Sequence, residues 1–435
     1  MNTPRHDCRL RLPERNQVEI RCLALDQLLA DDHQARLVWA YVEGLDLTPL
    51  YQAIQARQGV AGRDANDPRI LMALWLYATL DGIGSARQLD QLCQESLPYQ
   101  WLCGGVSMNY HSLADFRVEH VTLLDRLLTD GVAALLHQGL VQLTRVAQDG
   151  MKVRASAGAS SFRRRPTLAK CLDEAQAQVE ALKKADDEDA TAVSRRQQAS
   201  RQRAARERQE RVAAALREAE QLAARRQEVE RTKSVPAKQE KVRASTSDPE
   251  ARTMKMADGG YRPAYNAQFA TATVGGVIVG VDVTNAGADS GQMPKMVEQL
   301  QQRYGQTPTE MLVDGGFAVL DDIQAVHEAH AVKVYAPVKD EDKKRARGID
   351  PFVPRPRDAE GVAAWRERMG SAEAQGVYRE RGAAAEWVNA GARNRGLYQV
   401  RVRGRLKVLA VLLWQVLAHN LLRAVALRAS QAAAG

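Results

Sequence analysis

A long segment almost free of aromatic residues most constrains how this 435-residue chain can fold. Positions 155–248 are rich in Ala, Arg, Glu and Gln, and apolar residues recur there at alternating spacings of four and three. This heptad pattern predicts helices packed along a narrow apolar seam, not a globular core. We expect a helical hairpin, split near the acidic positions 186–189. The seam residues are Leu168, Leu172, Ala175, Val179 and Leu182.

The segment is also basic. Between Arg195 and Lys233 there are 12 basic and 6 acidic residues, an excess of 12 − 6 = +6. Three interpretations stay open: a solvated helix face, a clamp on a polyanion, or a coiled coil between subunits. The whole chain has 61 basic and 53 acidic residues, a net charge of +8 and a pI of about 9.2, which favours a polyanionic partner.

Residues 17–140, before this segment, have a helical pattern. Pro68 opens an apolar run that suits a buried helix, because proline is tolerated in the first helical turn. Ser85 and Asn109 are placed to cap two further helices. Helices of this kind indicate a compact bundle.

From Leu143 onward the apolar pattern changes to strand-like alternation. Strands followed by a strand–helix–strand order predict a mixed α/β sheet with helices on its faces. The expected strands are 143–149, 265–272, 274–283, 310–313 and 332–338, and the expected helices are 292–304 and 319–330.

Two further expectations concern the C-terminal third and the cellular compartment. The charge runs and prolines of 339–368 predict a mobile loop, and the apolar stretch 408–418 predicts a buried helix too short to span a membrane. Five sparse cysteines and a polar N-terminus without an apolar export segment fit a reducing cytoplasm.

Candidate chemistry lies at two strand ends. Asp149 precedes Gly150 at the end of the first strand, and Asp314 precedes Gly315 at the end of a later one. Carboxylates at such ends can hold a metal ion over a substrate, since strand ends line the ligand crevice of an open α/β sheet. Asp-Gly after a strand is also a common turn, and that alternative stays open.

A third candidate lies between basic residues. Tyr378, Arg381, Glu386 and Arg393 follow the spacing Y-x2-R-x4-E-x6-R, which suits a site where metal and phosphate meet, although an ordinary salt-bridged helix has the same composition. Glu380 is a rival acid on a different helical face. Carboxylate oxygens suit Mg²⁺, and two such ions can activate water and stabilise the leaving oxygen of a phosphodiester.

The order of these motifs resembles the DDE transposases of bacterial insertion sequences, which have an RNase H-like core. The matching runs cover nearly the whole length, and their order and spacing carry the resemblance. They are Gly82–Arg87, Trp101–Gly104, Tyr110–Arg117, Gln148–Ala155, Thr246–Arg252, Gly260–Gln268, Val313–Phe317, Tyr378–Arg393 and Ala418–Leu421.

The resemblance implies that Asp149, Asp314 and Glu386 are the catalytic triad and hold Mg²⁺, with Mn²⁺ as a substitute. It implies that Tyr378, Arg381 and Arg393 contact DNA phosphates, although the signature usually ends in Lys where Arg393 stands. It also implies a homodimer acting on terminal inverted repeats and target DNA, in the bacterial cytoplasm at the nucleoid and without a membrane.

A basic stretch follows Glu386. Positions 393–407 hold six basic residues and no acid, which is typical of a surface for a phosphate backbone, although a solvent-facing loop would look the same. Of these, Arg393, Arg395, Arg401 and Arg403 are the expected DNA contacts.

The expected domains are a helical DNA-binding domain (1–140), an RNase H-like core (141–155 and 248–435) and an inserted basic helical segment (156–247). The expected function is Mg²⁺-dependent cleavage of element ends with strand transfer into target DNA. Two alternatives stay open: a nuclease without strand transfer, and a catalytically inactive DNA-binding derivative.

Overall fold

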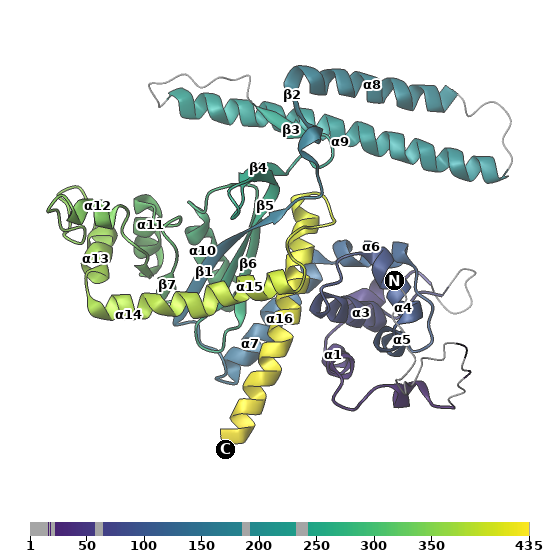
Figure 1. The fold of residues 1–435 in the computed structure, drawn as a ribbon, viewed down its shortest axis with the longest axis horizontal. Helices are drawn as coiled ribbons and strands as arrows, with labels where there is room; N and C mark the ends of the chain where they lie inside the picture. Colours follow the sequence, from purple (N-terminus) through teal and green to yellow (C-terminus); the bar gives the residue numbers. More distant parts are fainter. Residues whose placement is uncertain are drawn as a thin grey trace, which may run out of the picture.

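The computed structural model describes residues 22–56, 64–184, 192–231 and 242–434, together with Asn16 and Val18. Figure 1 shows a helical N-terminal region, a central sheet flanked by helices, and a long helix pair above the sheet. The expected split of the inserted hairpin at 186–189 lies outside the described residues.

The N-terminal region is helical, as expected. Asp67 caps the helix that Pro68 opens, and the side chains of Ser85 and Asn109 accept the backbone N–H groups of Gln88 and Ser112, so the expected caps are confirmed. A 3₁₀ turn at Leu25–Leu28 precedes the helices α1 (Gln34–Glu43), α2 (Thr48–Ala53), α3 (Pro68–Leu80), α4 (Ala86–Glu95), α5 (Leu97–Cys103), α6 (Tyr110–Glu119) and α7 (Val121–His137).

The central sheet is mixed, as expected. β5 runs antiparallel to β1, β4 and β6, whereas β1, β7 and β8 are parallel. The path β6-β5-β1-β7-β8, with helices on its faces, is an RNase H-like core. Its strands are β1 (Arg145–Arg154), β4 (Arg252–Lys255), β5 (Tyr261–Ala272), β6 (Ile278–Thr284), β7 (Glu310–Leu312) and β8 (Lys333–Tyr335).

Two expectations about these elements were wrong. Asp149 does not end the first strand: β1 continues to Arg154, because β5 pairs with it on both sides of Gly150. The expected loop 339–368 contains two helices, and the side chain of Trp365, which is only 2% exposed, holds the second of them against the core.

Helices flank the sheet. They are α10 (Gln292–Tyr304), α11 (Leu320–His330), α12 (Glu341–Arg345), α13 (Glu360–Met369), α14 (Ala372–Arg381) and α15 (Trp387–Asn394).

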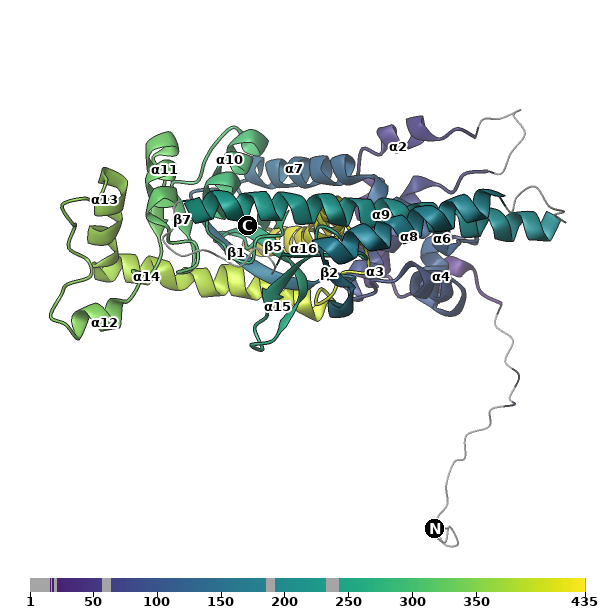
Figure 2. The ribbon, with the colours of Figure 1, turned by 90° about the horizontal axis from the view of Figure 1, so that it is seen from above.

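The inserted segment forms a pair of packed helices, α8 (Arg165–Lys184) and α9 (Ala192–Arg231), which extends across the core (Figures 1 and 2). A 3₁₀ turn at Ala159–Ser161 and two short antiparallel strands, β2 (Phe162–Arg164) and β3 (Arg243–Ser245), join it to the core. Leu168 is buried with Ala215 and Ala219 of α9. The seam is therefore buried inside one chain, and it does not argue for a coiled coil between subunits.

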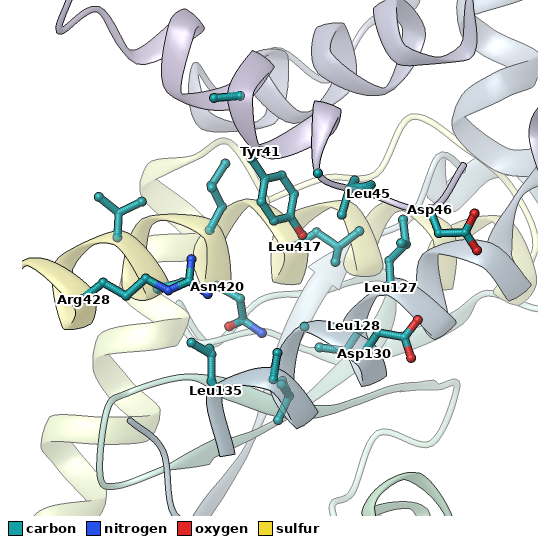
Figure 3. A pocket seen from close by; sticks show the side chains of 18 residues that line it. Tyr41, Leu45, Asp46, Leu127, Leu128, Asp130, Leu135, Leu417, Asn420 and Arg428 are labelled. Carbon is teal, nitrogen blue, oxygen red and sulfur yellow. The ribbon is translucent and has the colours of Figure 1, made fainter. Parts of the chain in front are cut away.

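The C-terminal helix α16 (Arg405–Ala434) is much longer than the apolar stretch that predicted it. It is long and apolar enough to cross a membrane, but 67% of its most apolar window is buried inside the protein, so it is a core helix. It packs on α3, α6, α7 and β6. Between α1, α7 and α16 lies a cavity of about 490 Å³ (Figure 3), and none of the three candidate acids lines it.

Candidate active site

Asp149 lies within β1, and Asp314 lies two residues after the end of the neighbouring parallel strand β7. In the β1–β7 ladder, Arg145 pairs with Glu310 and Ala147 with Leu312. Two residues after the last pair, just beyond the end of β7, Asp314 lies close enough to Asp149 for its charge to raise the pKa of that carboxyl. Two carboxylates that lie 165 residues apart in the sequence are therefore close together in the structure.

Asp149 is held in one orientation by three donors. Its Oδ1 accepts the Gly150 N–H at 2.9 Å and lies 3.2 Å from Nη2 of Arg381, while its Oδ2 accepts Nδ2 of Asn389 at 2.9 Å. Burial raises the pKa of Asp149, the Arg381 guanidinium opposes that rise, and the charge of Asp314 adds to it. This environment therefore destabilises the ionised form of Asp149, and a cation bound at the carboxylate would offset that destabilisation.

A π-helical turn at Gly382–Glu386 joins α14 to α15 and brings Glu386 toward this site. Residues five apart on an α-helix lie on different faces, at 100° per residue. The i→i+5 pattern of a π-helix widens the turn, and such turns occur frequently at functional sites. Here it lets Nη1 of Arg381 reach Oε1 of Glu386 at 3.4 Å.

Arg381 thus lies between two of the candidate acids. Its side chain is 11% exposed, whereas that of Glu386 is 68% exposed. The buried side of the guanidinium faces Asp149, and Glu386 lies at the solvent side. Tyr378 lies nearby on α14: burial raises the pKa of its hydroxyl, and the charges of Asp314, Asp149 and Glu386 raise it further.

Glu380, the alternative third acid, contacts a different part of the sheet. Oε1 of Glu380 lies 2.5 Å from Nη1 of Arg145, the first residue of β1 and four positions before Asp149, and Arg145 also pairs with Glu310. This arrangement favours Glu386 over Glu380 as the partner of Asp149 and Asp314.

The four expected DNA contacts of the basic stretch separate into three environments. Arg393 is exposed and lines a groove beside Gly150, and Arg401 and Arg403 line a second groove of about 1020 Å³ together with Arg211 of α9. Arg395 instead faces α16, where its guanidinium contacts Gln415 and His419, and burial lowers its pKa. That position favours a packing role for Arg395.

Sequence reasoning missed a polar cluster on the opposite face of β1. Asp289, after β6, accepts Nδ2 of Asn266 at 2.7 Å and Nε2 of Gln268 at 2.8 Å, and its Oδ2 lies 3.2 Å from Nζ of Lys152. The polar residues on the otherwise apolar strand β5 were a usable signal, since buried polar groups require partners. Asn389, the partner of Asp149, was also missed.

The polar cluster around Asp289 accounts for the presence of a glycine at position 150. A Cβ built at Gly150 would lie 2.2 Å from Oδ1 of Asp289, and one at Gly316 would lie 3.5 Å from its Oδ2. Asp289 therefore packs against the backbone that follows each of Asp149 and Asp314, and position 150 has no room for a side chain.

The order of the strands and the helices around the sheet show that this is an RNase H-like α/β protein with a helical N-terminal region. Residues 233–421 match the transposase DDE domain family, and residues 23–119 match the transposase domain family DUF772. The chain belongs to the DDE transposases of the insertion-sequence type. No curated protein and no solved structure matched it.

This family implies a divalent metal ion. Among the described residues, no three His, Cys, Asp or Glu side chains form a group that could hold an ion, and Arg381 contacts both Asp149 and Glu386. The donors fit nonetheless: they are carboxylate oxygens, which Mg²⁺ prefers, and the charges of Asp149 and Asp314 act on one another. Arg381 neutralises the carboxylates in this arrangement, and a bound ion would take over that charge.

Proposed function

We propose that this transposase cleaves DNA at the ends of an insertion sequence and joins those ends to target DNA, with Asp149, Asp314 and Glu386 as its acidic triad. The observation that carries the proposal is Arg381, whose guanidinium contacts both Asp149 and Glu386 while Asp314 lies beside Asp149. These two contacts and the proximity of Asp314 support assigning the three acids to one site.

The three carboxylates would hold Mg²⁺, or Mn²⁺ in its place, which when bound activates water and neutralises charge at the scissile phosphate. Asn389 orients the Asp149 carboxylate through its amide. Arg381 would hold a DNA phosphate beside the acids, because phosphate oxygens match the guanidinium fork. Tyr378 and Arg393 bind the DNA backbone at the two sides of the acids.

The wider DNA surface consists of Arg401 and Arg403 with the facing helix α9. Their groove also contains acids, Asp115, Glu207, Glu210 and Glu250, so it is mixed in charge. We propose that it holds duplex DNA of the terminal repeat, between the helical region 1–140, the inserted segment 156–247 and the core. We further propose that two copies of the chain act together on the two element ends, in the bacterial cytoplasm.

A gel assay with a labelled element end and a target plasmid tests this function. Mg²⁺-dependent joined products support transposition, whereas cleavage without joining favours the alternative of a nuclease. Asp149→Asn, Asp314→Asn and Glu386→Gln should each abolish both products, with exposed Asp321→Asn as the matched control. Processing that survives each of the three single substitutions would overturn the site assignment, whereas a wild-type chain that binds DNA but makes neither product would favour the inactive DNA-binding derivative.

A further inference from the structure

The groove that Arg393 lines has a volume of about 640 Å³ and begins at Gly150, next to the candidate catalytic Asp149. Its lining comes from β1, the β4–β5 hairpin, the loop after β6, and α15 with the segment that follows it. The residues that matter for its chemistry are Lys152, Arg154, Lys255, Arg262, Arg393 and Tyr398. We call it the β1 groove.

The β1 groove is strongly positive. Five basic side chains line it against one acid, Asp258, which pairs with Arg262 at 2.7 Å. Lys152 is paired with Asp289. Arg154, Lys255 and Arg393 are exposed, and none of them makes an ion pair within the described parts of the chain. Three free cations in one groove attract a polyanion.

The direction of the groove follows from the sheet. β7 pairs only with Arg145–Ala147, so β1 extends beyond it from Asp149 onward. At the far end, the backbone of Arg154 donates to the Tyr398 carbonyl at 2.9 Å and accepts from the Val400 N–H at 2.9 Å. Gly150 and Arg154 are therefore held about 13 Å apart on one rigid strand, a span of a few phosphates along one DNA strand.

An aromatic side chain indicates which form of DNA the groove binds. The groove volume of about 640 Å³ has room for one or two nucleotides. Tyr398 lies in the same groove with 61% of its surface exposed. Exposed aromatic rings beside free cations are the elements that bind single strands, since bases stack on the ring and cations hold the backbone.

We propose that the β1 groove binds an unpaired DNA strand adjacent to the scissile phosphate, with Arg154, Lys255 and Arg393 on its phosphates and Tyr398 stacked on a base. The proposal deepens the proposed function and rests on its placement of the cleavage site at Asp149. It assigns a single-strand site that is distinct from the mixed-charge groove of Arg401 and Arg403.

The test measures binding of the full-length chain to a fluorescent oligothymidylate, and to a duplex of equal length, by anisotropy in EDTA over a range of salt concentrations. Arg154→Gln/Lys255→Gln should weaken single-strand binding at least about tenfold and reduce the salt slope by about 1.4, which is 0.7 for each lost phosphate contact. Lys333→Gln/Arg357→Gln removes two exposed charges elsewhere and is the matched control.

The stacking step has its own pair of variants. Tyr398→Ala should weaken single-strand binding by at least about fivefold without changing the salt slope, and Tyr398→Phe should keep wild-type affinity. Thermal melting confirms that each variant folds. Wild-type single-strand affinity in Arg154→Gln/Lys255→Gln, or an equal loss in the charge control, overturns the proposal.

The EDTA condition separates this inference from the proposed function. Binding through the β1 groove by a chain that neither cleaves nor joins DNA would contradict the proposed function and support the groove. Cleavage and joining by a chain whose groove variants bind single strands normally would do the reverse.

Discussion

Glu380 is paired with Arg145, with Oε1 of the acid 2.5 Å from Nη1 of the guanidinium. The pair is half-exposed and tethers α14 to the start of β1. The pair engages Glu380, the acid next to Arg381 in the sequence, whereas Glu386 contacts Arg381, which in turn contacts Asp149.

Glu386→Gln and Glu380→Gln should therefore differ sharply. Glu386→Gln should lower the rate of DNA cleavage by roughly 10²–10³-fold or more, because it removes a charge that acts on the reacting phosphate. Glu380→Gln should cost at most about 1 kcal/mol of unfolding free energy and leave cleavage within a few fold. Single-turnover cleavage and urea unfolding measure the two effects, and the reverse order would make Glu380 the third acid.

Asn389→Ala tests whether the Asp149 carboxylate needs its amide partner. A hydrogen bond to a charged group contributes about 1.5–3 kcal/mol, so the variant should require more Mg²⁺ for half-maximal cleavage and cleave roughly 10–100-fold more slowly at low Mg²⁺. The control is Asn394→Ala, an exposed residue at the end of α15. Equal Mg²⁺ dependence of the two variants would remove Asn389 from the site.

Gly150→Ala should destabilise the protein by about 1–3 kcal/mol, because the new Cβ would lie 2.2 Å from Oδ1 of Asp289. Gly131→Ala is the matched control: it lies exposed within α7, where nothing approaches its added Cβ within 4 Å. It should stabilise by up to about 1 kcal/mol through helix propensity. Urea unfolding of both variants measures the contrast, and a neutral Gly150→Ala would show that Asp289 moves away at no cost.

His419 gives the protein a defined pH dependence. Burial lowers the pKa of this side chain to about 4, and its Nε2 lies 2.9 Å from the Gly276 carbonyl oxygen. The ordinary value is about 6.5, so the unfolded chain takes up the proton first as the pH falls. The stabilisation is complete above pH 6.5 and is lost between there and pH 4, by roughly 3 kcal/mol.

The measurement is urea unfolding of the wild type and His419→Gln across this pH range. The difference between the two unfolding free energies should shrink as the pH falls and then level off below pH 4. Parallel curves would show that His419 has the same pKa in both states.

Much of the fold could be predicted because its signals are local. Pro68, Ser85 and Asn109 mark helix starts through their own backbone chemistry, and the bounds 292–304 are those of α10. The predictions that failed depended on long-range pairing. Asp149 resembles a strand end followed by a turn, until β5 pairs across Gly150 and continues the strand. Trp365 lies in a charged, proline-rich stretch and becomes a helix anchor only by packing.

The site shows the same division. Asp149, Asp314, Glu386 and Arg381 have a recognisable order along the chain, and the structure brings them together, although their catalytic role stays a prediction. The link between Asp289 and Gly150 joins residues 139 positions apart and depends on the path of the chain after β6, which no local pattern reports. Arg395 looked equivalent to its basic neighbours, and only the position of α16 distinguishes it.

The strands β2 and β3 have a consequence for how this chain can change in length. Phe162 pairs with Ser245 across 83 positions, and the Ser161 and Ser245 hydroxyls meet at 2.7 Å. Because the two crossings into the helix pair lie side by side, lengthening, trimming or exchanging α8 and α9 leaves the strand ends of the core at the same separation. The positions of Asp149 and Asp314 relative to one another therefore stay the same, while the length of the helix pair, and with it the extent of its surface for DNA, can change in evolution.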